Sequence, residues 1–308
     1  MRWKKLGLVY GPNGSMSWAQ SHAMIPTPIR LNEEIIRVFT TFCDSNGIGR
    51  PGYVDVAAHN PLEVIKVSQS PLLDIGLPGT FDENGLLACS VVSLSNDRMY
   101  LYYVGFELGV KIRYRLLTGL AISEDGGNTF HRYASTPILE RSPSELYFRC
   151  GPYCIHDQES FRMWYVAGGE WTLLGGKPMP VYDIRYLESP DGIHWPMQGE
   201  IKISISQPDE YGFGRPCVIP KPGGGYRMFY SIRSRSLGEY RMGYAESIDG
   251  KNWLRMDDKL NLTTALGEFD SQAIMYAAPI LIGEKLYVFY NGNDFGREGF
   301  AAAFLEID

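Results

Sequence analysis

One aromatic pattern recurs five times along the chain, and this repeat constrains the fold more than any other feature. Strand-like runs end in Phe39, Tyr103, Tyr165, Tyr230 and Tyr290, at intervals of 64, 62, 65 and 60 residues. Alternating aromatic and aliphatic residues favour β-strands, and units of this length bury their hydrophobic faces by packing against their neighbours. The repeat therefore predicts one supersecondary unit that is copied five times.

A Ser-x-Asp-Gly turn follows the aromatic run in three of the repeats. The three turns span residues 123–130, 189–195 and 247–253, and each ends on an aromatic side chain. Asp-Gly between two strand-like runs predicts a hairpin, because glycine adopts the positive φ that tight turns require. The aspartate side chain can accept backbone N–H groups within such a turn, so we expect its role to be structural.

Each repeat also opens with a further strand-like run, at residues 24–29, 87–92, 152–155, 216–219 and 278–281. Four strands per repeat are typical of a propeller blade. We therefore predict an all-β, five-bladed β-propeller, with four-stranded antiparallel blades around a central pocket, as a single domain over residues 1–308. The last repeat lacks an Asp-Gly turn, and residues 3–9 are expected to supply its outer strand.

Composition excludes several classes of function. The chain carries 35 acidic and 29 basic residues, a net charge of −6, without a basic stripe, which argues against a nucleic-acid partner. No apolar run approaches the ~18 residues of a membrane span, and no secretory leader pattern follows the first residues. We therefore expect a cytoplasmic protein. Five scattered cysteines predict reduced thiols in the core rather than a metal site.

The repeat length and the Ser-x-Asp-Gly-x-x-Trp turns resemble those of the propeller glycoside hydrolases of families 43, 32, 68 and 130. The resemblance covers the chain from about residue 21 onward. It extends to uncharacterised relatives associated with bacterial surface-polysaccharide gene clusters. It implies a carbohydrate-active enzyme that acts at a glycosidic bond of a carbohydrate or sugar phosphate, with its reacting groups where the inner strands begin.

Charged residues gather just before the predicted inner strands. Glycosyl transfer uses carboxyl groups, one to protonate the leaving oxygen and another to activate water or attack the anomeric carbon. We therefore expect Asp82, Glu145 and Asp270 to be catalytic. Arginine adds bidentate recognition of a carboxylate or phosphate. The expected substrate-binding residues are His22, Glu83, Arg149, Arg215, Arg233, Tyr276 and Asn291.

The sequence departs from the pattern of these families at the positions that matter for chemistry. Cys150 stands where the resemblance to family 43 would place the general acid, and the segment after His22 holds no carboxylate. The catalytic residues of the families therefore do not transfer one by one. In family 130 phosphate takes the place of the catalytic base, so inorganic phosphate is a candidate co-substrate here.

Two other functions compete with the degradative enzyme. One is a glycosyltransferase or sugar-modifying enzyme of surface-polysaccharide biosynthesis, and the other is a catalytically silent carbohydrate-binding propeller. We expect no organic cofactor and no catalytic metal, while a structural calcium ion stays open. The sugar, the linkage, the stereochemistry and the oligomeric state are left open by the sequence.

Overall fold

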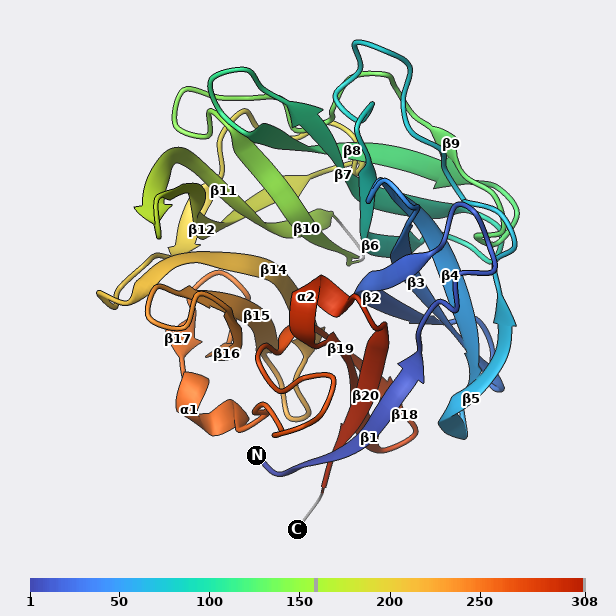
Figure 1. The fold of residues 1–308 in the computed structure, drawn as a ribbon. Helices are drawn as coiled ribbons and strands as arrows, with labels where there is room; N and C mark the ends of the chain where they lie inside the picture. The colour runs from blue at the N-terminus through green and yellow to red at the C-terminus, as the bar shows by residue number, and fades with distance from the viewer. Residues whose placement is uncertain (158–159, 307–308) are drawn as a thin grey trace. The chain divides into compact units, whose positions relative to one another are not determined.

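The protein forms two compact units, which are described separately. A computed structural model describes residues 1–157 and 160–306. Unit 1 comprises Met1–Leu72, Cys217–Ser231 and Glu239–Asp308, and unit 2 comprises Leu73–Pro216 and Ile232–Gly238. Nearly all of the regular structure is β-strand, as the sequence predicts (Figure 1).

Two four-stranded antiparallel sheets lie within the described part of unit 1. The first has the order β2 (Ser21–Arg30), β3 (Ile35–Cys43), β4 (Gly49–Ala57) and β5 (Asn60–Val67). The second has the order β1 (Trp3–Tyr10), β20 (Phe300–Leu305), β19 (Lys285–Asn291) and β18 (Met275–Ile282).

The outer strand that was predicted near the N-terminus is confirmed. Strand β1 pairs antiparallel with β20, with Trp3 opposite Leu305 and Tyr10 opposite Phe300, and the two strands run side by side in Figure 1. The last sheet of the chain thus takes its edge strand from the first residues.

An eight-stranded sheet lies within unit 2, counted over its described residues. Its strands are β6 (Leu86–Ser93), β7 (Met99–Leu108), β8 (Tyr114–Ser123), β9 (His131–Arg132), β10 (Phe148–His156), β11 (Phe161–Leu174), β12 (Lys177–Ser189) and β13 (Glu200–Ile203). Strands β6 to β9 and β10 to β13 are two antiparallel runs, each matching one predicted repeat.

The two runs are joined by a parallel pairing that sequence reasoning did not foresee. Phe148 and Arg149 at the start of β10 pair with Leu116 and Leu117 of β8. The backbone N–H of Leu116 also donates to the Tyr147 carbonyl at 3.1 Å. Two repeats expected to form separate sheets are therefore continuous through these bonds.

The remaining strands form a fourth sheet among the described residues. Its order is β14 (Glu210–Pro220), β15 (Tyr226–Ser234), β16 (Tyr240–Ser247) and β17 (Leu254–Arg255). Two short helices complete the elements, α1 (Asp257–Leu260) and α2 (Asn293–Gly296). No helix in the described part of the protein is long and apolar enough to cross a membrane.

The aromatic strands form the core, as predicted. The residues that end the five aromatic runs are all fully buried: Phe39, Tyr103, Tyr165, Tyr230 and Tyr290. Full burial of a large side chain stabilises a fold by roughly 1.5–3 kcal/mol. The five cysteines are buried thiols, also as expected.

The Ser-x-Asp-Gly turns are structural, and their bonds show why the motif is needed. Ser189 donates its hydroxyl to Asp191 Oδ1 at 3.0 Å, and the same oxygen accepts the backbone N–H of His194 at 2.9 Å. Gly192 has a φ of 73°, and a Cβ there would lie 2.6 Å from the Tyr102 hydroxyl oxygen. Glycine is therefore required at this position.

These turns make the fold sensitive to acid. Although burial raises it, hydrogen bonds from Thr129 and Ser123 lower the pKa of Asp125 to about 2. A folded-state pKa below the unfolded value of ~3.9 adds stability that is complete above about pH 4 and is lost as the pH falls toward 2. We expect the thermal unfolding midpoint to fall over this range, and less steeply in Asp125→Asn. Asp258→Asn, an exposed carboxylate outside the turns, is the control, and equal slopes in all three proteins would contradict the prediction.

Candidate functional site

The three carboxylates predicted to be catalytic share one environment. Asp82, Glu145 and Asp270 are all fully buried. Each accepts a hydrogen bond, at 2.9–3.1 Å, from the tyrosine that ends the aromatic run of its own repeat: Tyr103, Tyr165 and Tyr290. The same contact in three repeats indicates a feature of the repeat itself.

Each of the three carboxylates also forms an ion pair with a basic side chain. Arg132 on β9 donates through Nε to Asp82 Oδ2 at 2.8 Å, and Lys5 on β1 donates to Asp270 Oδ2 at 2.5 Å. Strands β9 and β1 are each the last strand of their run, so the carboxylates tie an outer strand to an aromatic strand. This geometry favours a structural role, and the catalytic role of these residues stays a prediction.

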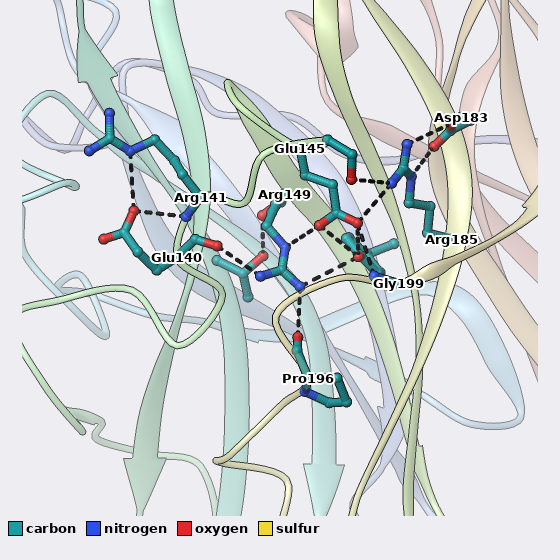
Figure 2. Close-up of polar contacts among 11 residues, drawn as sticks. Glu140, Arg141, Glu145, Arg149, Asp183, Arg185, Pro196 and Gly199 are labelled. Carbon is teal, nitrogen blue, oxygen red and sulfur yellow. Dashed lines mark hydrogen bonds and ion pairs between the residues drawn. The ribbon is translucent and has the colours of Figure 1, made fainter.

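Glu145 has the most partners of the three. Figure 2 shows its carboxylate between the guanidinium groups of Arg149 and Arg185. Arg149 Nε forms an ion pair with Oε2, and Arg185 Nη1 lies 3.0 Å from Oε1. The Gly199 backbone N–H also donates to Oε1 at 3.0 Å, so both carboxylate oxygens are occupied.

Arg149 and Arg185 extend this network through unit 2. Arg185 pairs with both oxygens of Asp183 at 2.7 and 3.1 Å, while burial raises the pKa of Asp183 against the lowering effect of Arg185. Arg149 donates to the carbonyl of Glu140 at 2.8 Å and to that of Pro196 at 3.2 Å (Figure 2). The cluster therefore holds several loops of this unit together.

The other predicted arginines are also engaged within unit 2. Arg215 is buried and donates through Nε to the Cys89 carbonyl at 2.9 Å. Arg233 is buried, donates to the Pro180 carbonyl at 3.1 Å, and lies 4.7 Å from the ring centroid of Tyr211. Both side chains therefore have structural partners, and anion binding by them stays a prediction.

Asn291 and Glu83 also have hydrogen-bond partners within the protein. Asn291 is fully buried, accepts the Ile25 backbone N–H at 2.7 Å and donates to the Ala23 carbonyl at 2.8 Å. Glu83 accepts the Gly79 backbone N–H at 2.7 Å within its own loop. Asn291 thus ties β2 to the end of β19, a role that requires its amide.

His22 and Tyr276 lie near the starts of β2 and β18, where the sequence places them, and both have an unusual backbone. Their φ values are 60° and 55°, and Asp294 and Phe295 in α2 have φ values of 49° and 58°. Non-glycine residues in this region cost about 1–3 kcal/mol each and are concentrated at functional sites. The His22 N–H donates to the Arg297 carbonyl at 3.1 Å, which brings these segments together.

Glu239 adds a second carboxyl group to this region. It is half-buried and directly precedes β16. Burial raises the pKa of Glu239, the charge of Asp294 raises it further, and Arg241 lowers it. Burial and Arg297 lower the pKa of His22, whereas Asp294 raises it.

The ring centroid of Tyr240, which follows Glu239, lies 5.6 Å from that of Tyr276 and 5.9 Å from that of Phe295. We call His22, Glu239, Tyr276, Asp294 and Arg297 the strained cluster, after the positive φ of three of its members. All five lie in unit 1, and unlike the three buried carboxylates each is at least partly exposed. Sequence reasoning named Tyr276 and His22 but missed Glu239. Glu239 lies outside the repeated pattern. In the sequence it is marked only by its position directly after a glycine and before a strand-like run.

The electrostatic coupling inside the strained cluster can be measured without any substrate. We expect Asp294→Asn to lower the pKa of Glu239, because it removes a negative charge that favours the protonated form. Arg241→Gln is expected to raise it, because a stabilising cation is lost. Carboxyl ¹³C shifts followed against pH give both values, and shifts of the same sign in the two variants would contradict the assignment.

The strained cluster has the components of acid–base chemistry. In many enzymes one carboxyl group acts as the acid and a second as the base, and their surroundings decide which does which. The imidazole of His22 and the phenol of Tyr276 add groups that can donate and accept hydrogen bonds. Among residues 1–157 and 160–306, no group of three His, Cys, Asp or Glu side chains is placed to hold a metal ion.

Comparison with known sequences identifies relatives that match the full chain. Two proteins of Mycobacterium tuberculosis, described as "Uncharacterized protein MT1551" and "Uncharacterized protein Rv1502", are each 32% identical to it over 309 residues. The alignments cover 99% of this chain and 100% of each relative. No protein-family profile matches the sequence.

Comparison with solved structures identifies glycoside hydrolases of the same fold. A structure of a BT0996–RGII complex has a TM-score of 0.74 at 18% identity, over 98% of this chain and 91% of its own. A thermostable family-43 glycoside hydrolase has a TM-score of 0.69 at 17% identity, over 96% and 93%. A structure from a study of "The GH130 family of mannoside phosphorylases" has a TM-score of 0.70 at 14% identity, over 99% and 94%.

Proposed function

We propose that this protein, which belongs to the family of the mycobacterial proteins MT1551 and Rv1502 and shares the glycoside hydrolase fold, is a carbohydrate-active enzyme acting at a glycosidic bond. The observation that carries the proposal is the strained cluster, in which the His22 N–H donates to the Arg297 carbonyl at 3.1 Å and which includes Glu239 and Asp294. Burial and the Asp294 charge raise the pKa of Glu239, which keeps it protonated to higher pH than an ordinary glutamate.

The two carboxyl groups have complementary roles in this proposal. Glu239, as the protonated acid, donates its proton to the glycosidic oxygen as the bond to the anomeric carbon breaks. Asp294, as the carboxylate, either removes a proton from an attacking water or attacks the anomeric carbon itself. Tyr276 and His22, in the same cluster, supply hydrogen-bonding groups for sugar hydroxyls.

Inorganic phosphate is the second nucleophile that the cluster could use. Burial and the charge of Arg297 lower the pKa of His22, and the charge of Arg241 lowers that of Glu239. These basic side chains favour an anion beside the acid, and phosphate would then attack the anomeric carbon and leave as a sugar 1-phosphate. This route needs only one protein carboxyl group, the acid Glu239.

We further propose that the five four-stranded runs are the blades of one five-bladed propeller over residues 1–308, around a charged pocket. The regular repeat and the glycoside hydrolase structures of the same fold support this arrangement. The cytoplasmic location, the absence of a nucleic-acid partner and the roles of Asp82, Glu145 and Asp270 stay predictions.

The test of the function is proton NMR of anomeric signals during incubation with a panel of glycans, with and without inorganic phosphate. New reducing-end signals without phosphate would identify a hydrolase, and a sugar 1-phosphate that appears only with phosphate would identify a phosphorylase. No new anomeric signal with any glycan would overturn the proposal and favour a donor-dependent transferase or a sugar-binding protein.

A further inference from the structure

A pocket in unit 2 is not used by the proposed chemistry. It has a volume of about 270 Å³, and its walls come from two segments, residues 133–138 and residues 193–195. The lining residues are Tyr133, Ala134, Thr136, Pro137, Ile138, Ile193, His194 and Trp195. The second segment belongs to a Ser-x-Asp-Gly turn, so a turn that the sequence marks as structural also forms a wall of this pocket.

Both walls are held in place by hydrogen bonds. The backbone N–H groups of Tyr133 and Ile138 donate to carbonyls of β8 at 2.9 Å. On the other wall the Trp195 indole N–H donates to the Gly192 carbonyl at 3.1 Å. The pocket is therefore formed before any ligand binds.

The buried Arg149 joins the two walls. Its guanidinium donates to the Glu140 carbonyl, two residues beyond the first wall, and to the Pro196 carbonyl, directly after the second (Figure 2). Glu145 in turn holds Arg149 by an ion pair. The buried network thus fixes the spacing of the walls, which is what a preorganised binding site requires.

His194 lines the pocket, and one of its ring nitrogens is held by Asp191. Its Nδ1 lies 2.7 Å from Asp191 Oδ2, and the side chain is 78% exposed. Because the carboxylate can only accept, Nδ1 carries the proton in the neutral ring, and Nε2 is left as an acceptor. Asp191 therefore fixes both the orientation and the tautomer of the imidazole.

The chemistry of the walls defines the ligand. The lining contains no Asp, Glu, Lys or Arg, so it offers no charge to an ionic ligand. The aromatic and aliphatic side chains offer apolar surface for the C–H face of a ring, while the hydroxyls of Tyr133 and Thr136 and His194 Nε2 can bond ring hydroxyls. The volume lies just below the ~300–1,000 Å³ of pockets for drug-sized ligands, which suits a single sugar ring.

We propose that this pocket binds one neutral sugar residue, at a site separate from the strained cluster. The proposal goes beyond the proposed function, because binding here requires no turnover. If the proposed function also holds, the pocket would bind one sugar unit of a glycan while a different sugar unit reacts at the strained cluster.

The experiment uses the full-length protein, ¹³C-labelled at histidine, and methyl glycosides of neutral hexoses and 6-deoxyhexoses as probes. The His194 imidazole signal is assigned by its loss in His194→Ala. We expect this signal to shift saturably with at least one glycoside. The signal of His59 is the internal control, because His59 is an exposed histidine beside a carboxylate, 77% exposed, in the other unit.

Two variants test whether the shift reports the pocket. Thr136→Trp fills the cavity from an exposed position and is expected to abolish the shift. Tyr133→Ala leaves the backbone bonds intact and is expected to weaken binding about tenfold, as loss of one aromatic contact does. No shift of the His194 signal with any glycoside, or unchanged affinity in both variants, would overturn the proposal.

Turnover of the glycan panel, measured in parallel, keeps the two proposals distinct. A His194 shift that Thr136→Trp abolishes, in a protein without turnover, would support the sugar site while the proposed function fails. Turnover without any His194 shift would overturn the sugar site alone.

Discussion

Replacing Glu145 by glutamine is expected to lower the free energy of unfolding by about 3–5 kcal/mol. The side chain is fully buried between Arg149 and Arg185. When the carboxylate is removed, Arg149 loses its counter-charge, while Arg185 keeps that of Asp183. Removing one partner from a buried ion pair is costly because an uncompensated charge remains in a poorly solvated site. Chemical denaturation followed by circular dichroism measures the loss.

A matched control lies five residues away. Glu140 pairs with Arg141 at 3.3 Å, but the two side chains are 61% and 47% exposed. Solvent screens such a pair, so Glu140→Gln is expected to change the free energy of unfolding by less than about 1 kcal/mol. If the free energy of unfolding falls equally in the two variants, the buried Glu145 network stabilises the fold no more than an exposed ion pair does, and the prediction is wrong.

Replacing Glu239 by glutamine is expected to lower kcat by about 10²–10⁴-fold on any glycan that the enzyme turns over. Glutamine has nearly the same shape but cannot donate the proton that the leaving oxygen needs, and general acid catalysis contributes about this factor. The unfolding midpoint should stay close to that of the parent protein, because Glu239 is half-buried rather than buried. Initial rates from the anomeric NMR assay, measured with both proteins folded, provide the comparison.

Glu298→Gln is the control for this experiment, since Glu298 is an exposed glutamate directly after Arg297 and should retain the parental kcat. The double variant Asp82→Asn/Asp270→Asn tests the alternative, in which the carboxylates predicted from the sequence are catalytic. If that variant stays folded but loses turnover, while Glu239→Gln keeps it, then the carboxylates predicted from sequence are catalytic and our assignment of Glu239 is wrong.

The repeats made most of the fold predictable. Strand periodicity and Asp-Gly turns act over a few residues, so the aromatic strands, the hairpins and the pairing of β1 with β20 could all be predicted. The parallel pairing of Phe148 with Leu116 could not be predicted, because it depends on the path of a loop rather than on a local pattern.

The candidate site was less predictable, for a physical reason. The spacing of the sequence repeats placed Asp82, Glu145 and Asp270 at the starts of the predicted inner strands. That spacing does not show whether a carboxylate is exposed to solvent or is buried against a tyrosine and a cation. The coupling of Glu239 to Asp294 joins the loop before β16 to α2, two segments far apart in sequence. Burial and through-space charge decide such roles, and both appear only once the chain is folded.

The pairing of β1 with β20 also has a consequence for biosynthesis. Lys5 and its partner Asp270 are 265 positions apart, and β20 lies farther along still. At a translation rate of ~5–20 residues per second, β1 leaves the ribosome tens of seconds before its neighbour is made. Its unpaired backbone groups could recruit another polypeptide throughout that interval. We therefore expect the nascent strand to need shielding until β20 is made, and yield in a foreign host to rise when chaperones are supplied.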